Sequence, residues 1–267
     1  MISRRQWMRV AGCAMLSALA RPAQAGAPQL DRHPAPEAGF FANAYLIEGP
    51  QSCVLVDAHL NLSEALDLAR LVRETGKPLT HIVITHPHPD HYLGLQFLGP
   101  QFPQAIVASA AQSLTFIETA ALDWPGYSNT TQALKTGPVI LAETKFQCTI
   151  LPDAESIAPL ILFDPARRVL VARDHVLNRQ HLWLVEGRGP AWRRNLDRLR
   201  ALSPVLVLPG HGAIGGPALI EQTDAYLSDY IGVAQQGMTK SERIAGMLAR
   251  YPDHVFPLAL HNSVLAS

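Results

Sequence analysis

The sequence predicts an α/β fold in which two β-sheets pack together and carry helices on their outer faces. Strand-like and helix-like patterns alternate along residues 26–267, and short Gly/Pro segments separate them. Two strand-rich halves with helices outside them are typical of paired sheets covered by helices. The 267 residues, 48% of them hydrophobic and 16% charged, are enough for one sizeable core.

The first half begins with a predicted hairpin. Asn43 to Glu48 and Ser52 to Asp57 are apolar runs divided by Gly49-Pro50. Apolar residues then recur at helical spacing from Leu62 to Gly76, with Ser63 as the expected cap. The remaining predicted elements are a strand at 79–84, a brief helix at 92–98, a strand at 105–108 and a helix at 110–122.

The second half also contains predicted strands followed by helices, and it ends in a helical segment. Predicted strands lie at 139–141, 146–151, 160–163, 169–171 and 205–208, and a predicted helix at 190–202. The segment from about 217 to 267 is expected to be helical. One helix spans 217–236, and Thr239 with Glu242 matches a capping box that starts another.

The first 25 residues are predicted to be a signal peptide. The segment Ser3 to Arg9 resembles a twin-arginine export signal, an apolar stretch follows, and Ala23-Gln24-Ala25 fits signal peptidase cleavage. The apolar stretch is too short to remain as a membrane anchor. A lipobox ending at Cys13 is the competing interpretation, but Arg9 lies only four residues before it. We therefore expect a bacterial protein that is periplasmic or secreted.

The charge distribution indicates which class of molecule the protein binds. The formal net charge is zero and the basic residues are scattered, so nothing indicates nucleic-acid binding, and a small-molecule substrate is expected. The oligomeric state does not follow from the sequence.

Cys53 and Cys148 each lie in a strand-like apolar run and are expected to be buried free thiols, with a disulfide as the alternative if their strands are adjacent.

The strongest signal is the loop from Thr85 to His91. It places His86, His88, Asp90 and His91 within six positions directly after a predicted strand. The strand end is rigid, and the two intervening prolines restrict the turn, so these four side chains are expected to converge. Imidazole with carboxylate suits zinc, and also iron or manganese.

This loop resembles the H-x-H-x-D-H signature of the metallo-β-lactamase superfamily, and other landmarks follow in the same order. The resemblance implies a four-layer αβ/βα sandwich of two mixed sheets flanked by helices. It also implies two metal ions, zinc first. His86 and His88 would hold one ion, and Asp90, His91 and His211 the other. Asp174 would bridge the two ions, and Asp57 would brace the loop from behind.

The sequence departs from the family pattern at two positions. Arg173 stands where the family usually has glycine. Glu155 stands where a histidine usually completes the first metal site, and carboxylate oxygen can replace imidazole there. Asp153, His175 and His181 are the alternatives to Glu155. If Glu155 does bind, three carboxylates and one hydroxide would neutralise two divalent ions, so manganese or iron would compete better.

The resemblance implies a metallohydrolase in which a metal-bound hydroxide attacks an ester, lactone, thioester or amide-type bond of a small molecule. Asp90 is the expected catalytic residue, because it would manage the proton of that hydroxide. His181, beside Trp183, is a candidate for substrate binding. Many true β-lactamases of the family lack the bridging aspartate, so Asp174 favours other substrates. The alternatives are a β-lactamase, an iron-dependent oxidoreductase and a degenerate, non-catalytic binding protein.

Overall fold

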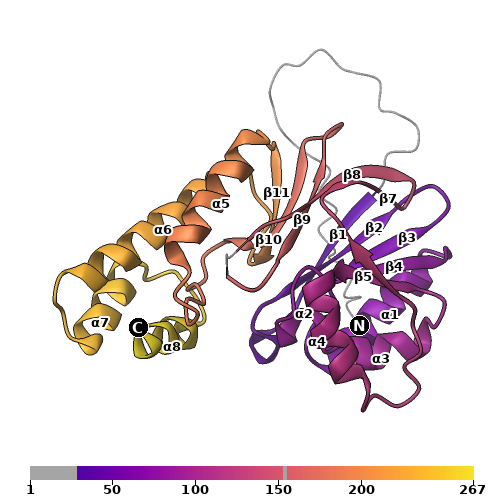
Figure 1. Ribbon diagram of the computed structural model, residues 1–267, viewed down its shortest axis with the longest axis horizontal. Helices are drawn as coiled ribbons and strands as arrows, with labels where there is room; N and C mark the ends of the chain where they lie inside the picture. Colours follow the sequence, from indigo (N-terminus) through magenta and orange to yellow (C-terminus); the bar gives the residue numbers. More distant parts are fainter. Residues whose placement is uncertain (1–28, 153–154) are drawn as a thin grey trace, which may run out of the picture.

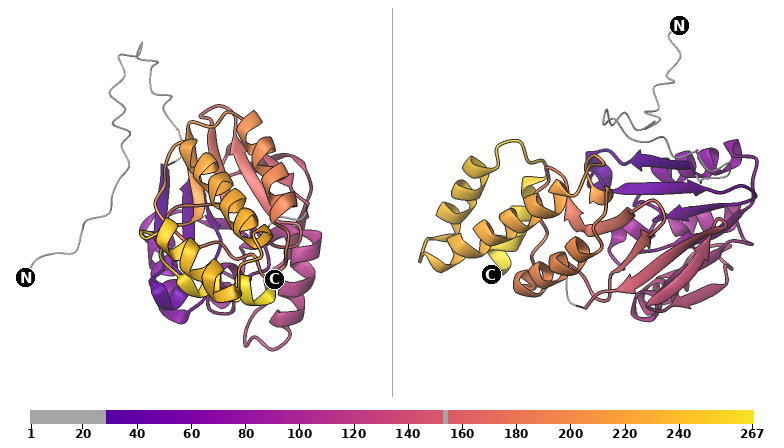
Figure 2. Two further views of the ribbon diagram at one scale, coloured as in Figure 1. Left: turned by 90° about the vertical axis from the view of Figure 1, so that its left-hand side faces the viewer. Right: turned by 90° about the horizontal axis from the view of Figure 1, so that it is seen from above.

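The computed structural model describes residues 29–152 and 155–267. The predicted signal peptide and Asp153 lie outside these residues. Two mixed β-sheets pack face to face, and helices cover the outer face of each (Figures 1 and 2). The predicted four-layer sandwich is therefore confirmed.

The first sheet has the order β1-β2-β3-β4-β5-β6. Neighbouring strands are antiparallel from β1 to β3 and parallel from β3 to β6. Helices α1, α3 and α4 lie against this half (Figure 1), and an apolar core separates α1 and α3 from the sheet. The strands are β1 (Gln29–Pro34), β2 (Asn43–Glu48), β3 (Cys53–Val56), β4 (Leu79–Val83), β5 (Ile106–Ala110) and β6 (Thr131–Leu134); the helices are α1 (Leu62–Glu74), α3 (Leu95–Gln101) and α4 (Ala111–Ala121).

The second sheet has the order β11-β10-β9-β8-β7. Only β10 and β11 are parallel, and the other pairs are antiparallel. Figure 2 shows α5 and α6 over its outer face, while α7 and α8 project beyond the strands (Figure 1). The elements are β7 (Gly137–Leu141), β8 (Thr144–Ile150), β9 (Leu160–Asp164), β10 (Val169–Leu177), α5 (Gly189–Ala201), β11 (Leu206–His211), α6 (Ala218–Gln235), α7 (Lys240–Arg250) and α8 (Pro257–Ala266).

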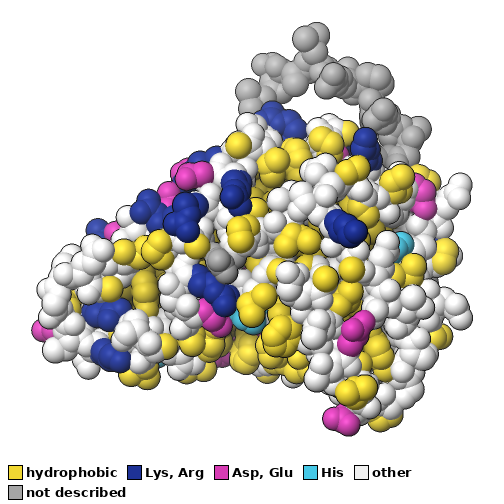
Figure 3. Space-filling model, viewed as in Figure 1, with side chains coloured by type: hydrophobic (Ala, Val, Ile, Leu, Met, Phe, Trp, Pro, Cys, Tyr) yellow, Lys and Arg dark blue, Asp and Glu magenta, His cyan; other side chains and the backbone are white. Residues whose placement is uncertain are grey.

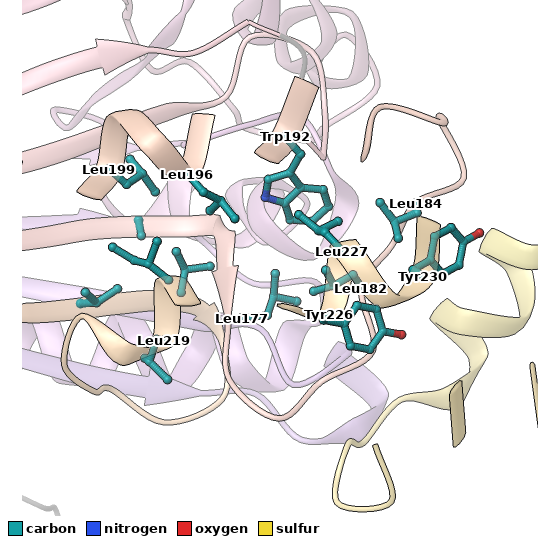
Figure 4. Close-up of a cluster of buried hydrophobic side chains, with 14 of the residues drawn as sticks. Leu177, Leu182, Leu184, Trp192, Leu196, Leu199, Leu219, Tyr226, Leu227 and Tyr230 are labelled. Atoms are coloured by element: carbon teal, nitrogen blue, oxygen red, sulfur yellow. The ribbon is translucent and has the colours of Figure 1, made fainter. Parts of the chain in front are cut away.

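A core on the outer side of the second sheet fixes the segment after β10. Trp192 of α5 and Leu227 of α6 pack with Leu182 and Leu184 of that segment (Figure 4). The backbone N–H of Leu184 donates to the hydroxyl of Ser263 in α8 at 2.7 Å. Apolar burial and this hydrogen bond together hold residues 178–186 against α6 and α8.

Several sequence predictions are confirmed and some are wrong. The β2–β3 hairpin and the Thr239–Glu242 capping box are present. Cys53 and Cys148 are buried free thiols in different sheets. The α1 cap is Asn61 rather than Ser63. Strands β1 and β6 were not predicted, and α8 lies within the segment expected to be helical, although its bounds were not predicted. Among the described residues, no helix has the length and apolar character needed to span a membrane.

Candidate metal centre

The loop after β4 carries four polar side chains into one site. His86 and His91 are completely buried, and Pro89 occupies the first turn of the short helix α2 (Pro89–Tyr92). His88 precedes that helix and Asp90 lies within it. Proline suits this position because its fixed φ matches the helix and its missing N–H would have no partner there.

Glu155 meets the two histidines nearest to β4. Its Oε2 atom lies 3.4 Å from Nε2 of His86, and its Oε1 atom contacts Nδ1 of His88. One ligand atom from each of these residues lies within 4.8 Å of the others, as a shared metal ion would require. Glu155 is 4% exposed, so this carboxylate is not an ordinary surface turn residue.

A second donor set joins α2 to the end of β11. Oδ2 of Asp90 lies 3.5 Å from Nε2 of His91 and 3.6 Å from Nε2 of His211. One ligand atom from each of these three residues also lies within 4.8 Å of the others. Residues more than 100 positions apart are thus brought together by the packing of the two sheets.

Asp174 lies between the two sets. Its Oδ2 atom is 3.0 Å from Nε2 of His211, 3.4 Å from that of His91 and 3.8 Å from that of His86. The strand predicted at 169–171 continues to Leu177 as β10, so Asp174 lies inside it, where the register with β11 is irregular. A Cβ atom at Gly210 would stand 1.6 Å from Oδ1 of Asp174, so only glycine leaves room for this carboxylate.

The donor sets fit a metal ion. Nε2 of His86, Nε2 of His91, Oε2 of Glu155 and Oδ1 of Asp174 are buried atoms without a hydrogen-bond partner among the described residues. Buried polar atoms are costly unless something satisfies them. Mixed imidazole and carboxylate donors suit zinc, iron or manganese.

The protonation states of the candidate ligands in the absence of metal also fit a metal site. Burial alone would lower the pKa of His88, but the adjacent Glu155 raises it to about 9. Burial would raise the pKa of Asp174, but His91 and His211 hold it well below its usual range. Protonated histidines therefore balance the carboxylates when no cation is present, and a metal ion would displace those protons.

Comparisons with known proteins agree with this geometry. The family model of the metallo-β-lactamase superfamily matches residues 38–211. The chain belongs to this superfamily. Members of the superfamily are generally metallohydrolases, and the fold with its His/Asp clusters fits a metal site.

Solved structures of the superfamily share the fold at low sequence identity. A metallo-β-lactamase family protein from Thermus thermophilus is 20% identical, with 90% of this chain and 91% of that chain covered and a TM-score of 0.66. A β-lactamase domain protein from Burkholderia ambifaria is also 20% identical, with coverages of 90% and 85% and a TM-score of 0.66. A metallo-β-lactamase from Pontibacter korlensis is 16% identical, with coverages of 78% and 97% and a TM-score of 0.63.

One curated relative matches a shorter segment. The uncharacterized protein YobT of Bacillus subtilis (strain 168) is 41% identical over 68 residues, which are 26% of this chain and 29% of that relative. The match therefore spans less than a third of the relative's length.

His91 and His211, which match the superfamily pattern, are oriented by hydrogen bonds from their Nδ1 atoms to residues outside the donor sets. Nδ1 of His91 donates to Oδ2 of Asp57 at 2.7 Å, and Nδ1 of His211 donates to the carbonyl oxygen of Phe40 at 2.9 Å. Each bond leaves Nε2 free to bind a metal. Asp57 also accepts from the backbone N–H of Thr85 at 2.8 Å, as expected for a residue that braces the loop.

Arg173, which replaces the usual glycine of the superfamily, is buried behind the metal loop. Its φ of +52° lies in the left-handed region that favours glycine. Its guanidinium contacts the carboxylate of Asp57, donates to the carbonyl of Asn43 at 2.6 Å and lies 5.2 Å from the ring centre of Tyr45. Burial would raise the pKa of Asp57, but Arg173 and His91 keep it below its usual value. The sequence did not reveal this ion pair.

The alternatives to Glu155 are placed differently. His175 is buried on β10 and belongs to none of the donor groups found among the described residues. His181 also lies outside those groups, and its Nδ1 atom is 2.8 Å from the hydroxyl of Tyr226. Within the described part of the chain, Glu155 therefore completes the first donor set.

A pocket of about 340 Å³ opens above the donor sets. Its floor includes His88, Asp90 and His211, and α8 contributes one wall. Figure 3 shows histidine surface beside hydrophobic and charged side chains in the hollow where the C-terminal helices meet the rest of the molecule. Trp124 and Tyr127 are not part of this lining and pack against the core under the first sheet.

Proposed function

We propose that this protein is a hydrolase that binds two divalent metal ions and cleaves an ester, lactone, thioester or amide-type bond of a small molecule. Zinc is the expected metal, with manganese or iron as alternatives. The observation that carries the proposal is the pair of donor sets joined by Asp174 at the floor of a pocket. The twin-arginine-like segment adds the proposal that the enzyme acts in the periplasm or outside the cell.

Each side chain of the site has a proposed role in metal binding or proton transfer. His86, His88 and Glu155 would hold one ion, and Asp90, His91 and His211 the other, with Asp174 between them. When bound, such ions supply Lewis acidity and a water nucleophile near neutral pH. Asp90 lines the pocket and its side chain is 12% exposed, so it can accept a proton from a nucleophile and pass it on.

His181 is proposed to polarise the substrate carbonyl by donating a hydrogen bond to its oxygen. It lines the pocket, and its buried Nε2 atom has no hydrogen-bond partner among the described residues. Burial lowers its pKa to about 4, so the imidazole is neutral at pH 7. Burial also raises the pKa of Tyr226, whose protonated hydroxyl can donate to Nδ1 of His181. The imidazole proton then resides on Nε2, where it can donate to the oxygen of a substrate carbonyl.

We expect His181→Ala to lower kcat/KM about 100-fold without loss of bound metal, because one donor to the developing oxyanion is removed. Tyr226→Phe should have a smaller effect in the same direction, because the favoured tautomer loses its support. Steady-state kinetics with metal analysis of each variant provide the measurement. Unchanged kcat/KM in His181→Ala would exclude this role.

His181 also predicts how stability depends on pH. Its pKa is about 4 in the folded protein and 6.5 in its reference state, so the unfolded chain binds a proton first as the pH falls below 6.5. Stability is thus lost between pH 6.5 and about 4. Replacing His181 with glutamine should make that loss shallower in urea unfolding curves measured across this range. His261, exposed on α8, supplies the matched histidine control.

The function is tested on residues 26–267 by metal analysis together with a panel of lactones, thioesters, esters and β-lactams. Hydrolysis that requires the bound metal supports the proposal. Iron with visible absorption and no hydrolysis would instead favour an oxidoreductase. Fewer than one metal ion per chain and no turnover would favour a binding protein.

A further inference from the structure

The pocket above the metal centre has an apolar wall and little positive charge. Phe40, Leu177, Trp183, Phe256 and Leu258 supply most of the apolar lining. Leu258 is 54% exposed, so this surface continues to the outside. An apolar group on a small substrate would be removed from water here.

Among the described residues of the lining, Glu186 is the one ionic side chain apart from the candidate metal ligands and His181. The indole N–H of Trp183 donates to its Oε1 atom at 3.4 Å, and the same oxygen lies 3.9 Å from Nε2 of His88. Its side chain is 31% exposed. The carboxylate is therefore held at the rim, facing both the pocket and the donor set beneath it.

None of the described residues that line the pocket is lysine or arginine. Basic side chains on the neighbouring outer surface (Figure 3) lie outside the lining. With two divalent ions and a hydroxide bound, the three carboxylates of the donor sets would already leave no net charge, and Glu186 would make the pocket negative. Arg173 and Asp57 form a buried pair of their own. A carboxylate or phosphate on a substrate would consequently lose water without gaining a cationic partner.

We propose that the pocket selects uncharged or ammonium-bearing substrates with a short apolar arm, and that Glu186 sets this preference. The inference rests on the proposed hydrolase function, whose substrate class it narrows. It disfavours carboxylate-bearing β-lactams and phosphate-bearing thioesters. An ammonium group can approach Glu186 while its methylene chain lies on Phe256 and Leu258.

A matched series of esters tests the preference. The substrates are p-nitrophenyl hexanoate, its ω-amino derivative and its ω-carboxy derivative, which share one leaving group and one chain length. We expect kcat/KM to be highest for the amine and about fivefold lower for the carboxylate than for the uncharged ester. Glu186→Gln should remove the advantage of the amine, and Glu186→Lys should reverse the order. Glu118→Gln on α4 changes the net charge equally at a site outside the pocket and should leave the order unchanged.

Binding separates this inference from the proposed function. Hexyltrimethylammonium and hexanesulfonate, which are poor metal ligands, are titrated into the metal-loaded protein by calorimetry, and the metal content of each variant is measured. Binding of the cation alone, weakened about fivefold in Glu186→Gln, supports the inference even if no ester is hydrolysed. Ester hydrolysis without any charge preference, and with no response to Glu186→Lys, would overturn the inference and leave the hydrolase proposal standing.

Discussion

Replacing Glu155 with alanine is expected to reduce the bound metal from two ions to one per chain. Glu155 is the carboxylate that faces both His86 and His88, and without it the first ion would keep only these two histidines and the shared Asp174. We expect kcat/KM to fall by more than the 10- to 100-fold typical of losing an outer partner of a metal ligand. Atomic absorption on dialysed protein and steady-state kinetics provide the measurements.

Two further variants make this experiment decisive. Glu155→His restores the donor usual in the superfamily and should retain two ions, with a preference shifted from manganese or iron toward zinc. Asp153→Ala tests the alternative ligand and should keep both ions. If Glu155→Ala binds two ions with full activity, Glu155 is not a ligand and the first site must be built otherwise.

Replacing Arg173 with methionine is expected to destabilise the metal-free protein by about 3 to 5 kcal/mol. The variant leaves Asp57 as a buried carboxylate without its guanidinium partner, although its bonds from Thr85 and His91 remain. Methionine keeps the apolar stem and the left-handed backbone conformation, so the comparison isolates the guanidinium. The free energy of unfolding in urea is the measured quantity.

A double-mutant cycle distinguishes the ion pair from general packing. Asp57→Asn in the Arg173→Met background should recover part of the lost stability, because the uncompensated charge is removed. Arg70 forms exposed ion pairs with Asp67 and Glu74, and Arg70→Met should change stability by less than about 1 kcal/mol. Equal losses for Arg173→Met with and without Asp57→Asn would contradict the charge-pair account.

The sequence predicted local features better than distant pairings. The hairpin of β2 and β3 and the α7 capping box depend on neighbouring residues, so their patterns are complete in short segments. The short edge strand β6 has only one buried side chain and gave no clear alternation. Helix α8 begins after Phe256, whose φ is +60°, and its apolar residues do not form a single stripe. Such elements are defined by tertiary packing rather than by periodicity.

The same distinction holds for the metal centre. His86, His88, Asp90 and His91 stand in one recognisable loop, whereas Glu155 lies alone in a turn without a motif of its own. The pairing of Arg173 with Asp57 links residues 116 positions apart and follows from the packing of the two sheets against each other. No short pattern in the sequence encodes a contact of this kind.

Helix α8 borders the pocket but supplies no candidate metal ligand among the described residues. Leu258, Ala259 and Asn262 border the pocket, while Leu260 and Val264 are anchored in the core beneath α5 and α6. The loop from Thr85 to His91, with the candidate metal ligands, lies some 170 positions earlier in the chain. Substitutions on one face of a ten-residue helix can therefore redefine which molecules enter while the ligand geometry is preserved. A scaffold of this kind can diversify its substrates through its final helix and keep a single chemistry.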